Sequence, residues 1–138
     1  MTALVTHLTE QITDAQVLRG AYAQTPEQRT LIVKRGASGP YTLQQSARTA
    51  SRQKQSGTCV LLVECWEYER DPGVYDEADA RLNELENAVI DSLPAFVQSQ
   101  HTLNRVTNLE FSIDPDGDLF RPSVASQITL TFTWRGTQ

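Results

Sequence analysis

Residues 124–134 alternate apolar and polar side chains almost without a break, and no other feature constrains the fold of this chain as strongly. Ile128, Leu130, Phe132 and Trp134 stand two positions apart, and a threonine separates each from the next. Successive side chains of a β-strand point to opposite faces of its sheet, so this spacing places the apolar set on one face. The sequence therefore predicts a strand with one buried face.

Three further segments are typical of strands. Thr30–Lys34 is a short apolar and β-branched run, which predicts a buried strand. Thr58–Glu69 is continuously apolar up to Val63, which predicts cover on both faces, and it alternates beyond that point. Apolar and polar residues alternate in Arg105–Ile113, so the face that carries Phe111 is expected to be buried.

Two segments have the apolar spacing of amphipathic helices. They are Thr2–Asp14 and Asp76–Leu93, and Pro94 is expected to end or kink the second helix. Ala15–Ala23 indicates a short strand or an irregular connection. The order of elements predicts an α+β fold, in which a mixed, mostly antiparallel sheet of about four to five strands packs two helices on one face.

The chain is expected to be a single α+β domain over residues 1–138, since its length of 138 residues is ordinary for one domain. The segment 37–57 differs from the rest because serine, threonine, glutamine, glycine and arginine dominate it. Such a composition supplies little core. We therefore expect an extended, polar and basic loop or arm within the domain.

Charge is distributed unevenly along the sequence. Six of the 12 Lys and Arg residues lie between Glu27 and Glu64, an interval without any carboxylate, although the net charge of the chain is -5. This asymmetry predicts a basic surface that meets an acidic partner, either nucleic acid or another copy of the same domain. A protein partner is favoured, because Tyr41 is the one aromatic residue of the basic segment and the domain as a whole is acidic.

Sites for metals or nucleophilic catalysis are poorly supported by the sequence. Asp114, Asp116 and Asp118 alternate as in a calcium loop, but the glycine and the glutamate that such a loop requires are out of place, so a solvated turn is favoured. Cys59 and Cys65 lie in a predicted strand too far apart for a disulfide, and we expect reduced, buried thiols. Neither thiol has the spacing to a histidine that zinc binding would require.

Phosphate-binding glycine loops and serine elbows are also missing from the sequence. Glu64, Glu67, Glu69 and Asp71 could supply an acid and a base, but a solvated strand end is the favoured interpretation. We expect a protein that is not an enzyme and that uses no cofactor. The sequence also predicts a soluble chain without a standard export signal or membrane span.

Several of these segments, in this order, resemble the tail terminator proteins of tailed bacteriophages, the family that includes the tube-capping minor tail protein of lambda-like phages. The resemblance is carried by the strand Cys59–Glu67, the acidic stretch 75–79, the helix Arg81–Leu93 and the closing strand Ile128–Trp134. It covers the chain from residue 59 onward as a sequence pattern and the whole chain as an order of elements.

The resemblance implies a structural virion protein of the tail and neck region, assembled in the host cytoplasm. It implies a homo-oligomeric ring of six subunits that caps the tail tube, stops its polymerisation and joins it to head completion proteins. Genomic DNA would pass through the ring without specific binding. A basic segment longer than in short-loop members leaves open a contractile tail, in which a sheath protein would be a further partner.

For the interface of such a ring we nominate the charged and aromatic residues around the basic segment and at the end of the central strand. These are Arg35, Tyr41, Arg48, Arg52, Lys54, Glu67, Glu69 and Asp71. A small cytosolic adaptor that binds nucleic acid or protein through the basic segment is the alternative. The two functions differ in what they predict for the oligomeric state and for the dependence of DNA binding on salt.

Overall fold

The computed structural model of the chain describes residues 1–20, 26–36, 41–46, 49–68, 75–99, 104–115 and 123–137. Its elements, in chain order, are α1 (Thr2–Gln11), β1 (Gln16–Arg19), β2 (Thr30–Arg35), β3 (Tyr41–Ser46), β4 (Thr49–Tyr68), α2 (Tyr75–Ser99), β5 (Asn104–Pro115) and β6 (Ser123–Thr137). The predicted α+β class is confirmed.

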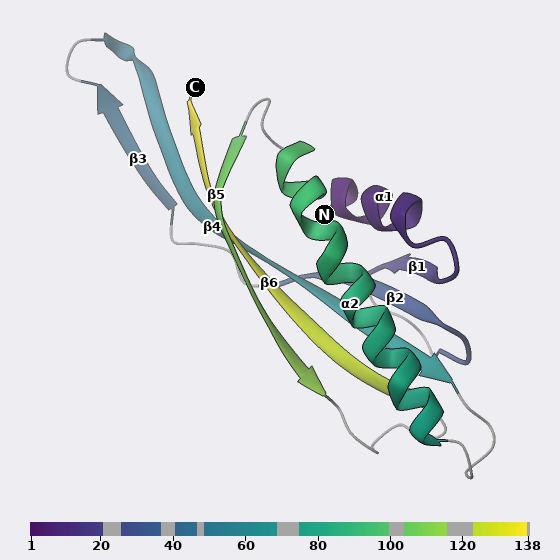
Figure 1. The fold of residues 1–138 in the computed structure, drawn as a ribbon. Coiled ribbons are helices and arrows are strands. Elements are labelled where there is room, and N and C mark those ends of the chain that lie inside the picture. The colour runs from purple at the N-terminus through teal and green to yellow at the C-terminus, as the bar shows by residue number, and fades with distance from the viewer. Residues whose placement is uncertain are drawn as a thin grey trace.

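The strands form one mixed sheet in the order β1-β2-β4-β6-β5. Among the described strands only the pair β1 and β2 is parallel, and the other pairs are antiparallel, so the sheet is mixed and mostly antiparallel as expected from the sequence. β3 pairs with the first part of β4, and β2 pairs with its last part. β3 and β2 therefore follow one another along the same edge of β4. Both helices lie over the same face of the sheet (Figure 1).

The two helices cover the sheet with the apolar faces that their sequences predict. Leu4 and Leu8 of α1 are buried, and α2 buries a stripe that runs from Ala78 through Leu85 to Phe96. Pro94 does not end α2, because the helix continues to Ser99. The burial of Phe96 in the core, one turn beyond Leu93, compensates for the hydrogen bond that a proline removes.

Much of the segment that the sequence predicted as loop, 37–57, is strand in the structure. Residues 41–46 pair with residues 49–57 of β4 and form a hairpin that extends the sheet beyond the helices (Figure 1). A segment poor in apolar residues can form such a hairpin, because cross-strand pairing satisfies its backbone hydrogen-bonding groups. β4 is therefore a single strand of 20 residues that runs from the hairpin into the domain body.

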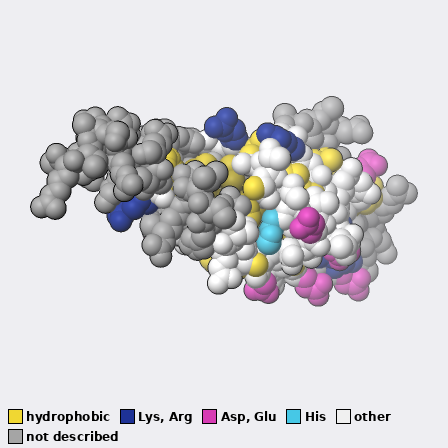
Figure 2. Space-filling view, turned by 90° about the horizontal axis from the view of Figure 1, so that it is seen from above, with side chains coloured by type: hydrophobic (Ala, Val, Ile, Leu, Met, Phe, Trp, Pro, Cys, Tyr) yellow, Lys and Arg dark blue, Asp and Glu magenta, His cyan; other side chains and the backbone are white. Residues whose placement is uncertain are grey.

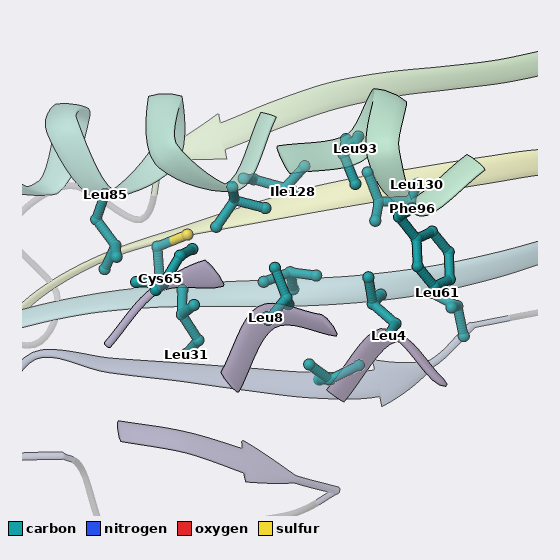
Figure 3. Close-up of a cluster of buried hydrophobic side chains, with 14 of the residues drawn as sticks. Leu4, Leu8, Leu31, Leu61, Cys65, Leu85, Leu93, Phe96, Ile128 and Leu130 are labelled. Atoms are coloured by element: carbon teal, nitrogen blue, oxygen red, sulfur yellow. The ribbon is translucent and has the colours of Figure 1, made fainter. Parts of the chain in front are cut away.

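The main core lies between the helices and the sheet. It contains alternate residues of the central strands, among them Leu31, Cys65, Ile128 and Leu130, packed against Leu8 and the apolar stripe of α2 (Figure 3). A second, smaller cluster on the opposite face consists of Ile32, Trp66 and Ala125.

The sequence predicted that β4 is buried on both faces up to Val63, but burial on both faces begins later along the strand. Leu61 and Val63 are buried beneath the helices, whereas Val60 and Leu62 on the opposite face are only half-buried. Trp66 is 1% exposed on that opposite face. The continuous apolar run thus marks the strand correctly, but its two faces are not covered along the same length.

Candidate assembly surfaces

A buried carboxylate links β4 to both the helical layer and the residues before β2. Glu67 is 4% exposed, and its Oε1 lies 3.1 Å from Nε of Arg29, while its Oε2 lies 3.8 Å from Nε of Arg81 in α2. Arg29 also reaches Asp14, with Nη1 3.2 Å from Oδ2. The Glu67 and Arg29 atoms are close enough for an ion pair but are not aligned as a hydrogen bond.

Burial dominates the electrostatics of Glu67. Desolvation raises the pKa of its carboxyl above the ordinary value of 4.5, and the opposing effects of Arg29 and Arg81 are smaller. A charge held inside the fold by two arginines stabilises their relative placement only while all three remain together. We conclude that Glu67 positions α2 and the residues before β2.

Glu64 occupies the other face of β4, three residues away. It is 7% exposed, forms an ion pair with Lys34 and accepts a hydrogen bond of 3.1 Å from Nε1 of Trp66. The sequence favoured a solvated strand end for Glu64, Glu67, Glu69 and Asp71. That prediction is wrong for Glu64 and Glu67, because both are buried. Because the two carboxylates lie on opposite faces of the sheet, they cannot act together as an acid and a base on one substrate.

The cysteines are free thiols on the helix-facing side of β4. Burial raises the pKa of the Cys65 thiol well above its ordinary range, and the nearby Glu86 carboxylate adds to the shift. Cys59 is only half-buried, in contrast to the burial that the sequence predicted. His7 bonds through Nε2 to the carbonyl oxygen of Ser92 at 2.8 Å, and its ring packs on Phe96.

The residues nominated for an interface fall into different parts of the structure. Arg35 ends β2 and is exposed, and the register with Leu61 places it on the helix-facing side of the sheet. Tyr41 begins β3, and Arg52 and Lys54 lie in the first part of β4. Of this nominated set, Arg48, Glu69 and Asp71 lie outside the described residues, as do Asp116 and Asp118 of the calcium-like pattern.

An open apolar cavity lies where the helical layer stops and the sheet continues toward the hairpin. Its volume is about 300 Å³. Met1 and residues from α2 and three strands line it, namely Met1, Cys59, Leu61, Phe96, Val106, Phe132 and Trp134. No stretch of sequence predicts this cavity, because separate segments of the chain form it: Met1, β4, α2, β5 and β6.

The second surface that the sequence did not predict is the outer strand β5. Phe111 is 50% exposed and Ile113 is 37% exposed, although the alternation of this strand predicted burial. They pair with Leu130 and Ile128 of β6, so they face the same side as the core. That half of β5 lies beside α2 and is not covered by it (Figure 1).

Charged residues lie near both surfaces, but most of them are on the other face of the sheet. The exposed Arg35 adjoins the cavity, because it pairs with Leu61, whereas Arg135 follows Trp134 and faces the opposite side. On β5 the exposed carboxylates Glu110 and Asp114 alternate with Phe111 and Ile113 and also face that opposite side. Figure 2 shows hydrophobic side chains near the middle of the viewed face, with most of the visible Lys and Arg side chains along the upper side of the view and most Asp and Glu along the lower side.

Within the described ranges, no three His, Cys, Asp or Glu side chains come together as metal ligands would. Neither α1 nor α2 is long and apolar enough to cross a membrane. The sequence matches no protein-family model and has no significant match among curated proteins. The geometry of the two apolar surfaces is therefore the basis for the functional proposal.

Proposed function

We propose that the chain is a structural assembly protein that acts as a phage tail terminator. In this role it forms a ring that caps the tail tube, stops tube polymerisation and offers a joining surface to head completion proteins. One observation carries the proposal: the molecule has two unlike apolar surfaces, the exposed side of β5 and the open cavity near the hairpin. A ring of identical subunits requires such a pair, because each copy binds its two neighbours through different patches.

The organisation of the sheet supports an assembly role. β4 and β6 continue past the helices, and the hairpin of β3 and β4 projects from the body (Figure 1). An extended sheet end can pair or pack with a neighbouring chain more readily than a covered one. The resemblance of the segment order to tail terminators agrees with this arrangement, and the partners it implies are the tail tube protein, head completion proteins and, in a contractile tail, the sheath protein.

The side chains that could have supported catalysis are otherwise engaged. Glu64 and Glu67 take part in ion pairs on opposite faces of β4, and Cys65 is buried with a raised thiol pKa. A thiol of that kind is a poor nucleophile, since the thiolate is the reactive form. These contacts favour a structural protein over an enzyme.

The test is to polymerise a purified tail tube protein in the presence and absence of the chain and to measure tube lengths by negative-stain electron microscopy. We expect added density at one end of each tube and a halt in growth once the chain is added. A matched control is the variant Leu130→Ala, whose core is disrupted. Tubes that grow to the same lengths with bare ends would contradict the proposal.

The same preparations distinguish the adaptor alternative. An adaptor that uses the basic segment would bind DNA with an affinity that falls steeply as salt is added, because phosphate contacts release counterions. The triple variant Arg48→Ala, Arg52→Ala and Lys54→Ala would abolish that binding. For a terminator we expect tube capping without such DNA affinity.

A further inference from the structure

We propose that a basic patch on the face of the sheet opposite to the helices, here named the reverse face, binds an acidic stripe of α2 in the next copy of this chain. The basic patch consists of Lys54, Arg105 and Arg135, and the acidic stripe consists of Glu77, Glu84 and Asp91. The inference rests on the proposed ring and deepens it, because it names a charged contact between neighbouring subunits.

The register of three strands produces the basic patch. Arg135 of β6 pairs with Arg105 of β5 on one side and with Ser56 of β4 on the other. Lys54 stands two positions before Ser56 along β4, so its position belongs to the same face. That face is the reverse face, because the preceding residue Trp134 lines the cavity on the helix side. The three positions lie within about 10 Å across the strands and about 7 Å along them.

The pairing of Arg105 with Arg135 favours a negatively charged partner. Like charges directly opposite one another on neighbouring strands repel and destabilise the pair. Arg135 is exposed, and no ion pair between described residues engages it. The adjoining strand segments 41–46 and 49–57 contain no Asp or Glu. On β5 the first carboxylate after Arg105 is that of Glu110, five residues and roughly 16 Å farther along the strand.

The acidic stripe follows one line along α2. Glu77, Glu84 and Asp91 are seven residues apart, which is close to two turns, so their positions share one side of the helix. All three are exposed, and none of the ion pairs between described residues involves them. Arg81 lies between the first two but is directed to the buried Glu67. The stripe is about 21 Å long at ~1.5 Å per residue, long enough to span the basic patch.

Charge complementarity identifies a second copy of the chain as the occupant. Both helices lie over one face of the sheet and the basic patch is on the other, so the two charged sets cannot meet within one molecule (Figure 1). Opposite charges across an interface guide association and fix its register. A DNA duplex fits less well, because the net charge of the chain is -5 and the acidic helix would repel phosphate groups.

The position of the two sets on opposite sides of the molecule determines the type of assembly. A contact between unlike patches leaves one patch of each kind free after two copies have joined. Further copies can then add at both ends until a ring closes.

Charge reversal tests this contact. The acid-reversed variant carries Glu77→Lys, Glu84→Lys and Asp91→Lys, and the base-reversed variant carries Lys54→Glu, Arg105→Glu and Arg135→Glu. The two surfaces of the first variant are both positive and those of the second are both negative. Each variant alone is therefore expected to be monomeric by light scattering at low salt, where the wild type is expected to associate. An equimolar mixture should associate again, because its surfaces alternate in sign.

Two further variants separate this contact from a general effect of charge, and circular dichroism checks that every variant is folded. A chain that carries all six substitutions has both surfaces inverted, so it should associate as the wild type does. The matched control Glu10→Lys, Glu27→Lys and Asp114→Lys changes the net charge by the same amount as the acid-reversed variant, at exposed positions outside the stripe. It should also associate as the wild type does.

Several results would overturn the proposal. They are a wild type that stays monomeric at low salt, a mixture of the two variants that stays monomeric, and a control that loses association as the acid-reversed variant does. A monomeric wild type that binds a DNA duplex, with the binding lost in the base-reversed variant, would assign the patch to nucleic acid instead.

The outcomes distinguish this inference from the proposed function. If the wild-type chain caps tubes and both reversed variants cap them equally well, the terminator proposal stands and the named surfaces are wrong. If reversal abolishes association, mixing restores it and tubes remain uncapped, the contact between copies is real and the proposed function fails.

Discussion

Neighbouring strands β6 and β5 present similar apolar residues to the same face of the sheet, yet only one of them buries these residues. Leu130 and Ile128 of β6 are fully buried, while their register partners on β5, Phe111 and Ile113, are 50% and 37% exposed. α2 packs on β4 and β6, and its cover ends before the second half of β5. Alternation thus determines which side a residue faces, and the placement of the helices determines whether that side is covered.

The largest difference between the two strands is expected in folding stability. Leu130→Ala leaves a hole beneath α2 and should lower the free energy of unfolding by about 2–5 kcal/mol, as buried leucines do. Phe111→Ala is expected to change the free energy of unfolding of the monomer by only about 0.5 kcal/mol. Urea titration followed by circular dichroism measures both variants, and equal losses would mean that β5 is covered after all.

The second comparison is between an arginine that pairs with the buried Glu67 and an arginine that is exposed. Arg29→Ala removes a partner of the buried Glu67 and leaves only the more distant Arg81, so we expect a loss of about 2–3 kcal/mol. The exposed Arg35 is the matched control, and Arg35→Ala should change the free energy of unfolding by about 0.5 kcal/mol or less. A similar effect of both variants would exclude a structural role for the Glu67 ion pairs.

A smaller effect is expected in the pH dependence of stability. Burial raises the pKa of Glu67 in the folded chain, so the folded state binds this proton more tightly than the unfolded state does. The contribution of Glu67 is therefore fully present below its ordinary pKa of 4.5 and is lost as pH rises through the raised pKa. Relative to Glu67→Gln, the wild type should be more stable at about pH 5 than at about pH 7. A relative stability that rises with pH would contradict the assignment.

The smallest expected effect is a difference in reactivity between the thiols of Cys59 and Cys65. Cys59 lies in the open cavity, whereas Cys65 is buried and its thiol pKa is raised. An aromatic disulfide reagent should titrate one thiol per folded chain and both thiols in denaturant, with absorbance as the readout. Cys59→Ser should remove the fast reaction completely. If Cys59→Ser leaves that fast reaction unchanged, the exposed thiol has been assigned to the wrong residue.

Local sequence patterns predicted the elements of this fold well. Period-two alternation identified β6, and helical spacing identified the stripe of α2 from Ala78 to Leu93, because both signals depend only on local geometry. The hairpin of β3 and β4 was missed because polar strands have no apolar period to detect. The sequence predicts that Pro94 ends or kinks the second helix, but α2 continues past it to Ser99, and Phe96 beyond the proline is buried in the core.

The candidate surfaces required the tertiary structure. Glu67 was chosen for its charge, but only the fold brings Arg29 and Arg81 to it and places it inside. Residues as distant as Met1 and Trp134 line one cavity, and no pattern in either segment indicates this. Arg35 was nominated from charge alone, and the register of β2 with β4 places it beside Leu61, which lines that cavity.

The length of β4 has a mechanical consequence. At ~3.3 Å per residue, its 20 residues span roughly 65 Å, from the hairpin to the ion pairs of Glu67. The ladder with β6 accompanies it from Lys54 to Tyr68, so no linker or hinge separates the hairpin from the part of the sheet beneath α2. A load applied at the hairpin would therefore reach the part of the sheet beneath α2 through continuous hydrogen-bonded strands.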